Sequence, residues 1–116
     1  MKISEIAQAI NGEILTKNHD NELDIKSACS ADLMSDVMAF SKENAMLLTG
    51  LINPQVVRTA EMMDMKVIVF VRGKKPTESM IELAEEKGIA LIATEYPLFE
   101  ASGRLYEKGI QGSGEN

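Results

Sequence analysis

Basic, hydroxyl and glycine residues that could hold a small anion gather in three short segments of the sequence. These are Thr49-Gly50, Arg72-Gly73-Lys74-Lys75 and Thr94-Glu95-Tyr96. Exposed backbone N–H groups after a glycine favour an anion, and the second segment concentrates positive charge. The candidate ligand-binding residues are Thr49, Gly50, Arg72, Gly73, Lys74 and Thr94. Neither a GxGxxG nor a GxxxxGK[ST] pattern is present, so a solvated basic turn is the alternative interpretation.

Residues for catalysis are scarce. The sequence has no Gly-x-Ser-x-Gly, only one histidine (His19) and only one cysteine (Cys29), which we expect to be a loop residue and a packing residue. Glu95 is the best lone carboxylate, but a general base needs a positioned substrate. Asp32 and Asp36, four residues apart, suit a metal or acid–base pair on one helix, or simply a cap and a solvated face. We expect no enzyme, catalytic residue, metal or cofactor.

The elements that would position the candidate anion site are buried strands. Residues 67–71 read Val-Ile-Val-Phe-Val, which suits a strand covered on both faces. Similar apolar runs lie near 45–49 and 89–93, and helical segments separate the three. This predicts an α/β fold with a mainly parallel sheet and a βαβαβ core flanked by helices. Ligands bind beyond the carboxyl ends of such strands, where the three polar segments fall.

Two strand–helix units resemble each other at an offset of 23 residues, so that 67–69 aligns with 90–92. The constant length of a βα unit explains this as well as duplication does. Asn53-Pro54 and Thr77 suit helix starts, and Gly88 suits a helix end.

The flanking segments complete one domain over residues 1–108. We expect a helix within 2–12, strands near 13–16 and 24–31, and a short helix over 33–40 that Ser30 or Asp32 would cap. Residues 109–116 read Gly-Ile-Gln-Gly-Ser-Gly-Glu-Asn, a composition that predicts a flexible C-terminal tail.

Composition limits the partners. A net charge of −6 argues against nucleic acid and anionic membranes as partners. The sequence has no apolar run near the ~20 residues that a transmembrane helix needs and no signal peptide, so we expect a cytoplasmic protein. With 8 methionines and few aromatics, the core should be aliphatic and Met-filled, or else the methionines mark an interaction surface.

Three landmarks across residues 24–108 resemble the DRTGG domain family. Leu-Leu-Thr-Gly ends at Gly50, a strand runs into Arg-Gly-Lys-Lys-Pro, and a third strand runs into Thr-Glu-Tyr-Pro-Leu-Phe. Gly73 and Pro76 match the family's second turn, where Val71-Arg72 replace Thr-Gly. Tyr96 and Phe99 match its Tyr-Asp-Thr-Phe segment, where Pro97-Leu98 replace Asp-Thr.

The resemblance implies an α/β module similar to the N-terminal domain of HPr kinase. Such domains occur in regulatory proteins, including CBS-domain pyrophosphatases and phosphotransacetylases, are noncatalytic and commonly dimerise. Stand-alone members encoded beside iron-only hydrogenase components imply an accessory role. We therefore expect a noncatalytic regulatory or assembly module acting as a homodimer, with a partner protein in a larger metabolic or hydrogenase-type complex. The alternative is a sensor that binds a phosphate-bearing ligand at the six candidate residues.

Overall fold

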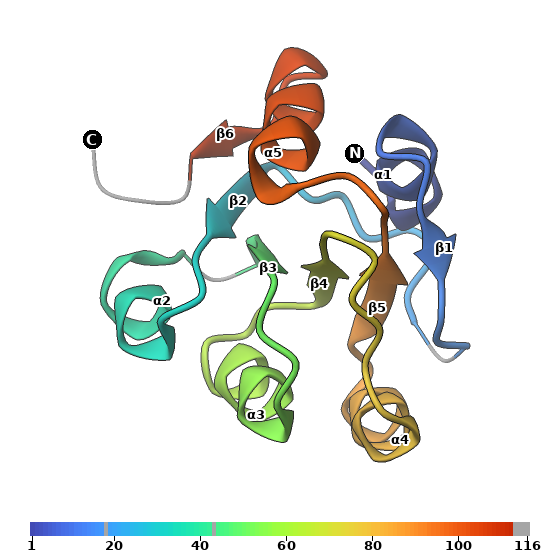
Figure 1. Cartoon of the computed structure of the whole chain (residues 1–116), viewed down its shortest axis with the longest axis vertical. Coiled ribbons are helices and arrows are strands. Elements are labelled where there is room, and N and C mark those ends of the chain that lie inside the picture. The colour runs from blue at the N-terminus through green and yellow to red at the C-terminus, as the bar shows by residue number, and fades with distance from the viewer. Residues whose placement is uncertain (18, 43, 113–116) are drawn as a thin grey trace.

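The computed structural model describes residues 1–17, 19–42 and 44–112, which form one six-stranded sheet in the order β1-β5-β4-β3-β2-β6 (Figure 1). The strands are β1 (Glu13–Ile14), β2 (Ser27–Ser30), β3 (Met46–Thr49), β4 (Val67–Phe70), β5 (Ala90–Ala93) and β6 (Gln111–Gly112). Only β1 runs antiparallel to its neighbour. The expected α/β fold with a mainly parallel sheet and a βαβαβ core is confirmed.

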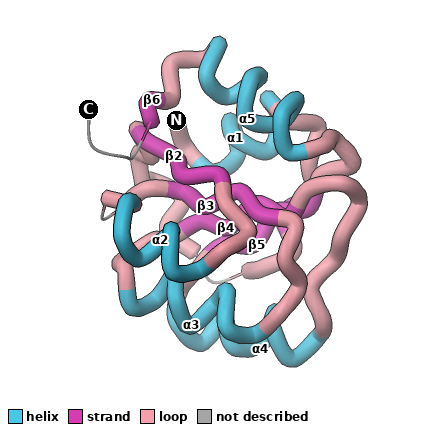
Figure 2. Tube along the Cα trace, turned by 60° about the vertical axis from the view of Figure 1, so that its left-hand side comes forward, coloured by secondary structure: helices cyan, strands magenta, loops and turns pink. Residues whose placement is uncertain are grey.

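Helices cover both faces of the sheet. They are α1 (Ile3–Ala9), α2 (Met34–Phe40), α3 (Pro54–Met62), α4 (Glu78–Lys87) and α5 (Leu98–Glu107). Two of them, α1 and α5, lie on one face, and α2, α3 and α4 lie on the other (Figure 2). None of the helices in the described ranges is long and apolar enough to cross a membrane.

The central strands are buried on both faces, as their unbroken apolar runs predict. Every residue of β3, β4 and β5 is buried. Within β4, Val67 and Val69 pack toward α1 and α5, whereas Ile68 and Phe70 pack with residues of α3 and α4. Strand β4 pairs with β5 at the offset of 23 residues seen in the sequence, since Val67 faces Ala90.

The helix ends follow the local sequence signals. The Asn53 side chain accepts a hydrogen bond from the Gln55 N–H (2.8 Å), and Thr77 Oγ1 accepts one from the Met80 N–H (3.3 Å). Gly88 ends α4 in the left-handed conformation (φ 72°), where a glycine has no steric cost. The α3 and α4 starts were therefore predictable.

Two details differ from the sequence-based expectations. Helix α2 begins at Met34 without a side-chain cap, so neither Ser30 nor Asp32 caps it. Ile110 is buried against the α1–α5 face, and Gln111 and Gly112 pair with β2. The boundary expected after residue 108 is too early, because Ile110 packs into the core and the two residues after it add a strand to the sheet. Residues 113–116 of the expected tail lie outside the described residues.

Candidate functional site

The six residues of the predicted ligand site lie at one edge of the sheet. Strands β3, β4 and β5 are parallel neighbours, and Thr49 faces Phe70, which faces Ala93. The three polar segments therefore begin side by side where these strands end. Their proximity was correctly inferred; their binding of a ligand stays a prediction.

The turn after β3 is closed by a carboxylate of the same chain. Asp32 Oδ1 accepts hydrogen bonds from the Gly50 N–H (2.8 Å) and from Thr49 Oγ1 (3.0 Å). The same threonine oxygen accepts from the Leu51 N–H (3.1 Å). The Gly50 N–H was expected to bind an anionic ligand. In the structure it donates to the carboxylate of Asp32 instead.

The turn after β4 uses its N–H groups within the chain. Arg72 (φ 59°) and Gly73 (φ 70°) both have left-handed backbone conformations, as in a type I′ turn. The Arg72 N–H donates to the Tyr96 carbonyl (2.8 Å). The Gly73 N–H donates to the Thr94 carbonyl (2.9 Å), and the Lys74 N–H donates back to the Val71 carbonyl within the turn (3.1 Å). The backbone N–H groups of this turn are therefore hydrogen-bonded to the segment after β5 and within the turn itself.

The turn after β5 is closed around Thr94, which is only 3% exposed. Its hydroxyl donates to the Ile10 carbonyl (2.7 Å) and accepts from the Tyr96 N–H (3.2 Å). Its neighbour Glu95 projects over Gly73, where an added Cβ would lie 2.8 Å from Glu95 Oε1. An acidic group thus stands beside the glycine that was expected to receive an anion.

A small cavity of about 200 Å³ borders this edge and carries charges of both signs. Glu13 and Glu95 line it together with Lys75, which pairs with Glu13 at 3.3 Å. What remains for an anion are the exposed side chains of Arg72 and Lys74. We call this edge, formed by the six candidate residues and Asp32, the polar edge.

The suggested pairing of Asp32 with Asp36 on one helix is wrong, because Asp32 precedes α2 and turns back to β3. Among the described residues, no group of three or more His, Cys, Asp or Glu side chains is arranged to hold a metal ion.

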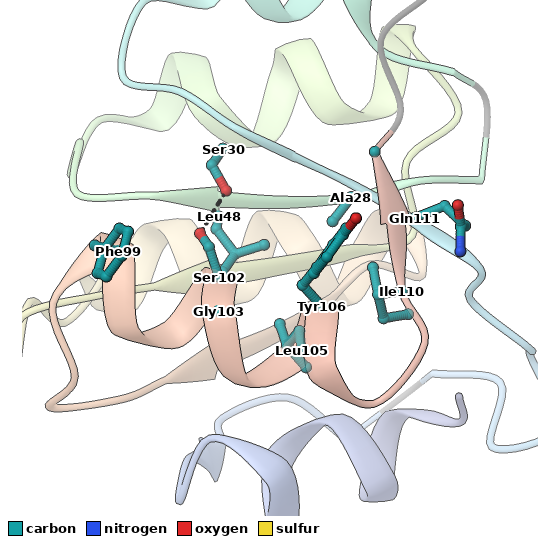
Figure 3. A pocket seen from close by; sticks show the side chains of 11 residues that line it. Ala28, Ser30, Leu48, Phe99, Ser102, Gly103, Leu105, Tyr106, Ile110 and Gln111 are labelled. Carbon is teal, nitrogen blue, oxygen red and sulfur yellow. Dashed lines mark hydrogen bonds between the residues drawn. The ribbon is translucent and has the colours of Figure 1, made fainter. Parts of the chain in front are cut away.

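The sequence analysis missed an apolar groove beside α5, which we call the α5 groove (Figure 3). Its volume is about 390 Å³. It is lined by residues of β2, β3, α5 and the segment into β6, namely Ala28, Ser30, Leu48, Phe99, Ser102, Gly103, Leu105, Tyr106, Ile110, Gln111 and Gly112. At its rim Phe99 is 90% exposed and Tyr106 71% exposed. These are large apolar surfaces without a covering element among the described residues.

The α5 groove lies between one side of α5 and the strands β2 and β3. Ala101 and Leu105 are buried against the sheet. A second stripe, Phe99-Ser102-Gly103-Tyr106, follows the i, i+3, i+4, i+7 spacing of one helix face and lies along the groove, beside the buried side of α5 (Figure 3). The Ser102 hydroxyl forms a 2.8 Å hydrogen bond with the Ser30 hydroxyl of β2, which fixes the helix beside the groove. The spacing of Phe99, Ser102, Gly103 and Tyr106 can be seen in the sequence, but it does not show there whether this side of the helix is covered.

A cation on another side of α5 fixes the turn that precedes the helix. The Arg104 guanidinium lies 4.5 Å from the centre of the Tyr96 ring and hydrogen-bonds Glu100 (3.0 Å). The hydrogen bond with Glu100 and the charge effect of Tyr96 raise the pKa of Arg104. Arg104 thus joins Glu100 of α5 to the ring of Tyr96, which precedes the helix.

Comparison with known proteins decides the family. The DRTGG domain model matches residues 5–107. The chain belongs to the DRTGG domain family. The match begins earlier than the resemblance over residues 24–108, so α1 and β1 are part of this DRTGG domain.

A solved structure shares the fold of this DRTGG domain. It contains the CBS and DRTGG domains of the regulatory region of Clostridium perfringens pyrophosphatase, complexed with the activator diadenosine tetraphosphate. The TM-score is 0.76 at 19% sequence identity, over 90% of this chain and 45% of that chain. This DRTGG domain therefore spans less than half of the regulatory region that it resembles.

Proposed function

We propose that this chain is a noncatalytic regulatory or assembly module that acts as a homodimer. The observation that carries the proposal is the α5 groove, with Phe99 and Tyr106 exposed at its rim. Contiguous exposed apolar surfaces are uncommon on monomeric proteins and mark interaction sites. The polar edge, by contrast, already uses the N–H groups of its candidate residues internally.

The family supports a regulatory role. The pyrophosphatase segment that shares this fold belongs to a regulatory region and was solved with an activator. A noncatalytic domain affects a partner through contact, and an exposed apolar surface is one feature that marks such a contact site. In this proposal the dimer presents its remaining surface to a partner protein within a larger metabolic or hydrogenase-type complex.

A second candidate function is a sensor for a phosphate-bearing ligand at the polar edge. The observation that favours it is that Arg72 and Lys74 are exposed in the turn between Thr49 and Thr94. In this case the two cations, rather than backbone N–H groups, supply the affinity. Removing them should then abolish ligand binding and leave the oligomeric state unchanged.

Sedimentation velocity over a range of protein concentrations tests the homodimer. We expect the wild-type protein to dimerise and the double variant Phe99→Ser/Tyr106→Ser to become monomeric. The matched control is Met62→Ser, which removes an apolar side chain 63% exposed at the end of α3. A wild-type monomer at about 100 μM, far above the μM range in which specific interfaces of ordinary size bind, would contradict the proposal.

Thermal shift with added phosphate separates the sensor from the module. The probes are inorganic phosphate and diadenosine tetraphosphate, each titrated against the wild-type protein and Arg72→Ala/Lys74→Ala. The module predicts no saturable rise in Tm for either protein. A saturable rise in the wild-type protein that the double variant loses would favour the sensor instead.

A further inference from the structure

Gly103 is a costly residue that the fold of the chain itself does not require. It lies within α5, where a glycine is less favourable than alanine by ~0.5–1 kcal/mol. A Cβ added at Gly103 would have no neighbour within 4 Å, and its φ is not in the left-handed region. Neither close packing within the described chain nor backbone conformation explains it. An approach from outside the chain does, because a glycine lets another helix come close.

Gly103 also lies in the middle of the exposed stripe of α5. Phe99 precedes it by four residues and Tyr106 follows it by three, with Ser102 beside it. Read in either direction along the helix, the stripe is aromatic, small, small, aromatic. A twofold axis that reverses the helix at the middle of this stripe therefore places aromatic against aromatic and small against small.

We propose that two copies of the chain pair through antiparallel α5 helices, with the twofold axis passing between Ser102 and Gly103. This inference rests on the proposed homodimer and specifies its geometry. Phe99 of each copy packs against Tyr106 of the partner subunit, and the small residues allow the two helices to approach at the centre. The aromatic side chains enter the α5 grooves of both copies.

The occupant of the groove is a second copy, because two symmetry-related rims supply much of the area that a dimer needs and the groove walls are there to add to it. An aromatic side chain buries 150–250 Å² at an interface, so four of them contribute ~600–1,000 Å². A stable interface of ordinary size buries ~1,200–2,000 Å². The groove walls formed by Ala28, Ile110 and Gly112 lie beside these rings and supply further area.

The two faces of the sheet support the same geometry. Helices α2, α3 and α4 cover one face of the sheet, whereas α1 and α5 are the helices that the described residues place on the face with the α5 groove (Figure 2). Leu48 and Ala28 of the sheet line this groove beside α5. A second α5 helix lying beside the first covers this part of the sheet. The antiparallel direction also opposes the two helix dipoles, which a parallel pair would align.

The substitution Gly103→Leu tests the proposed crossing, because it acts in opposite directions on folding and association. In a monomer the added side chain meets open space and improves helix propensity. We expect the Tm of the monomeric variant to match or exceed that of the wild-type monomer. At the crossing the side chain separates the helices, so we expect the dimer dissociation constant to rise by about tenfold or more.

The control is Gln55→Leu, which adds the same side chain at an exposed position of α3 on the other face of the sheet. We expect it to leave the dissociation constant unchanged. If the wild-type protein dimerises and Gly103→Leu does not weaken it, this geometry is wrong and the homodimer stands. If the wild-type protein is monomeric, both proposals fail.

Cysteine cross-linking tests the direction of the helices and does not depend on the folding of a bulky variant. Cys29 is first replaced by serine. A disulfide requires Cα atoms within about 7 Å. Phe99→Cys mixed with Tyr106→Cys should form a cross-linked heterodimer on mild oxidation, and neither variant alone should cross-link. The oxidation is done at a protein concentration at which sedimentation shows the mixture to be dimeric. Under that condition, cross-linking of each variant with itself, or no cross-link in the mixture, overturns the antiparallel arrangement.

Discussion

The polar edge and the α5 groove differ in whether their chemistry is already used. The polar edge has the residue types of a binding site, yet its candidate N–H groups and both threonine hydroxyls are hydrogen-bonded within the chain. The α5 groove has a mostly apolar surface, and Phe99 and Tyr106 are exposed beside it. The type of a residue indicates which interactions its side chain is able to make. Its contacts within the fold determine whether it is still available to bind another molecule.

This difference gives the two regions separate roles in folding and association. Substitutions at the polar edge should change the free energy of unfolding, because they remove bonds that hold β3, β4 and β5 together. Substitutions of the exposed rim residues of the α5 groove, Phe99 and Tyr106, should change association and leave unfolding nearly unaltered. The predictions below test this separation, beginning with the largest expected change in stability.

Thr94→Val should destabilise the protein by about 2–3 kcal/mol. The valine leaves the Ile10 carbonyl and the Tyr96 N–H without their partners inside the fold, and each unsatisfied buried group costs ~1–3 kcal/mol. Thr94→Ser keeps the hydroxyl and should cost less than about 1 kcal/mol, the value of one methyl group. Urea unfolding measures both. If the two variants lose the same stability, the hydroxyl does not close the polar edge.

Asp32→Ala should cost about 1–2 kcal/mol, because it removes the carboxylate that accepts from Gly50 and Thr49. The matched control is Asp36→Ala. Asp36 is an exposed acid in the first turn of α2, and its loss should cost no more than about 0.5 kcal/mol. Chemical denaturation of the pair gives the difference. Equal denaturation midpoints for the two variants would mean that the hydrogen bonds of Asp32 to Gly50 and Thr49 do not stabilise the fold.

Arg72→Gly should stabilise the protein by about 0.5–1 kcal/mol. Arg72 has a φ of 59°, a conformation that costs a side-chain-bearing residue ~1–2 kcal/mol, part of which the greater unfolded-state freedom of glycine offsets. The readout is the thermal unfolding curve, with Lys74→Gly as a control outside the left-handed region. A destabilised Arg72→Gly variant would show that the arginine side chain makes contacts that hold the polar edge.

Phe99→Ser should change the free energy of unfolding of the monomer by less than about 0.5 kcal/mol, since the ring is 90% exposed. Its dimer dissociation constant should nevertheless rise by an order of magnitude or more. Unfolding is measured at concentrations below the dissociation constant, and association by sedimentation. A large loss of monomer stability would show that the α5 groove also contributes to folding, which would contradict the separate roles of the two regions.

Much of the fold was predictable because its signals are local. Buried parallel strands require unbroken apolar runs, so residues 67–71 indicated a central strand, and Asn53-Pro54 and Thr77 marked helix starts. The placement of the polar turns at one edge followed from parallel pairing alone. The chemistry of that edge did not follow, because Asp32 reaches Gly50 and Thr94 reaches Ile10 across long stretches of sequence.

The C-terminal strand and the exposed side of α5 were not predicted, because both depend on which neighbouring surfaces the fold leaves open. A segment of glycines and polar residues predicts a tail, but Ile110 finds an open place on the sheet and brings Gln111 and Gly112 into register with β2. The second stripe of α5 consists of Phe99 and Tyr106 with Ser102-Gly103 between them, a spacing that the sequence contains. It becomes visible as a surface only when the inner side of α5 is known to be occupied.

Native mass spectrometry of the protein purified without added ligand tests the central claim most directly. The claim is that this DRTGG domain functions through association at the α5 groove and not through ligand binding at the polar edge. It predicts a dimer whose mass equals that of two polypeptide chains. A monomer that retains a defined phosphate-containing mass would contradict it and make Arg72 and Lys74 the functional residues.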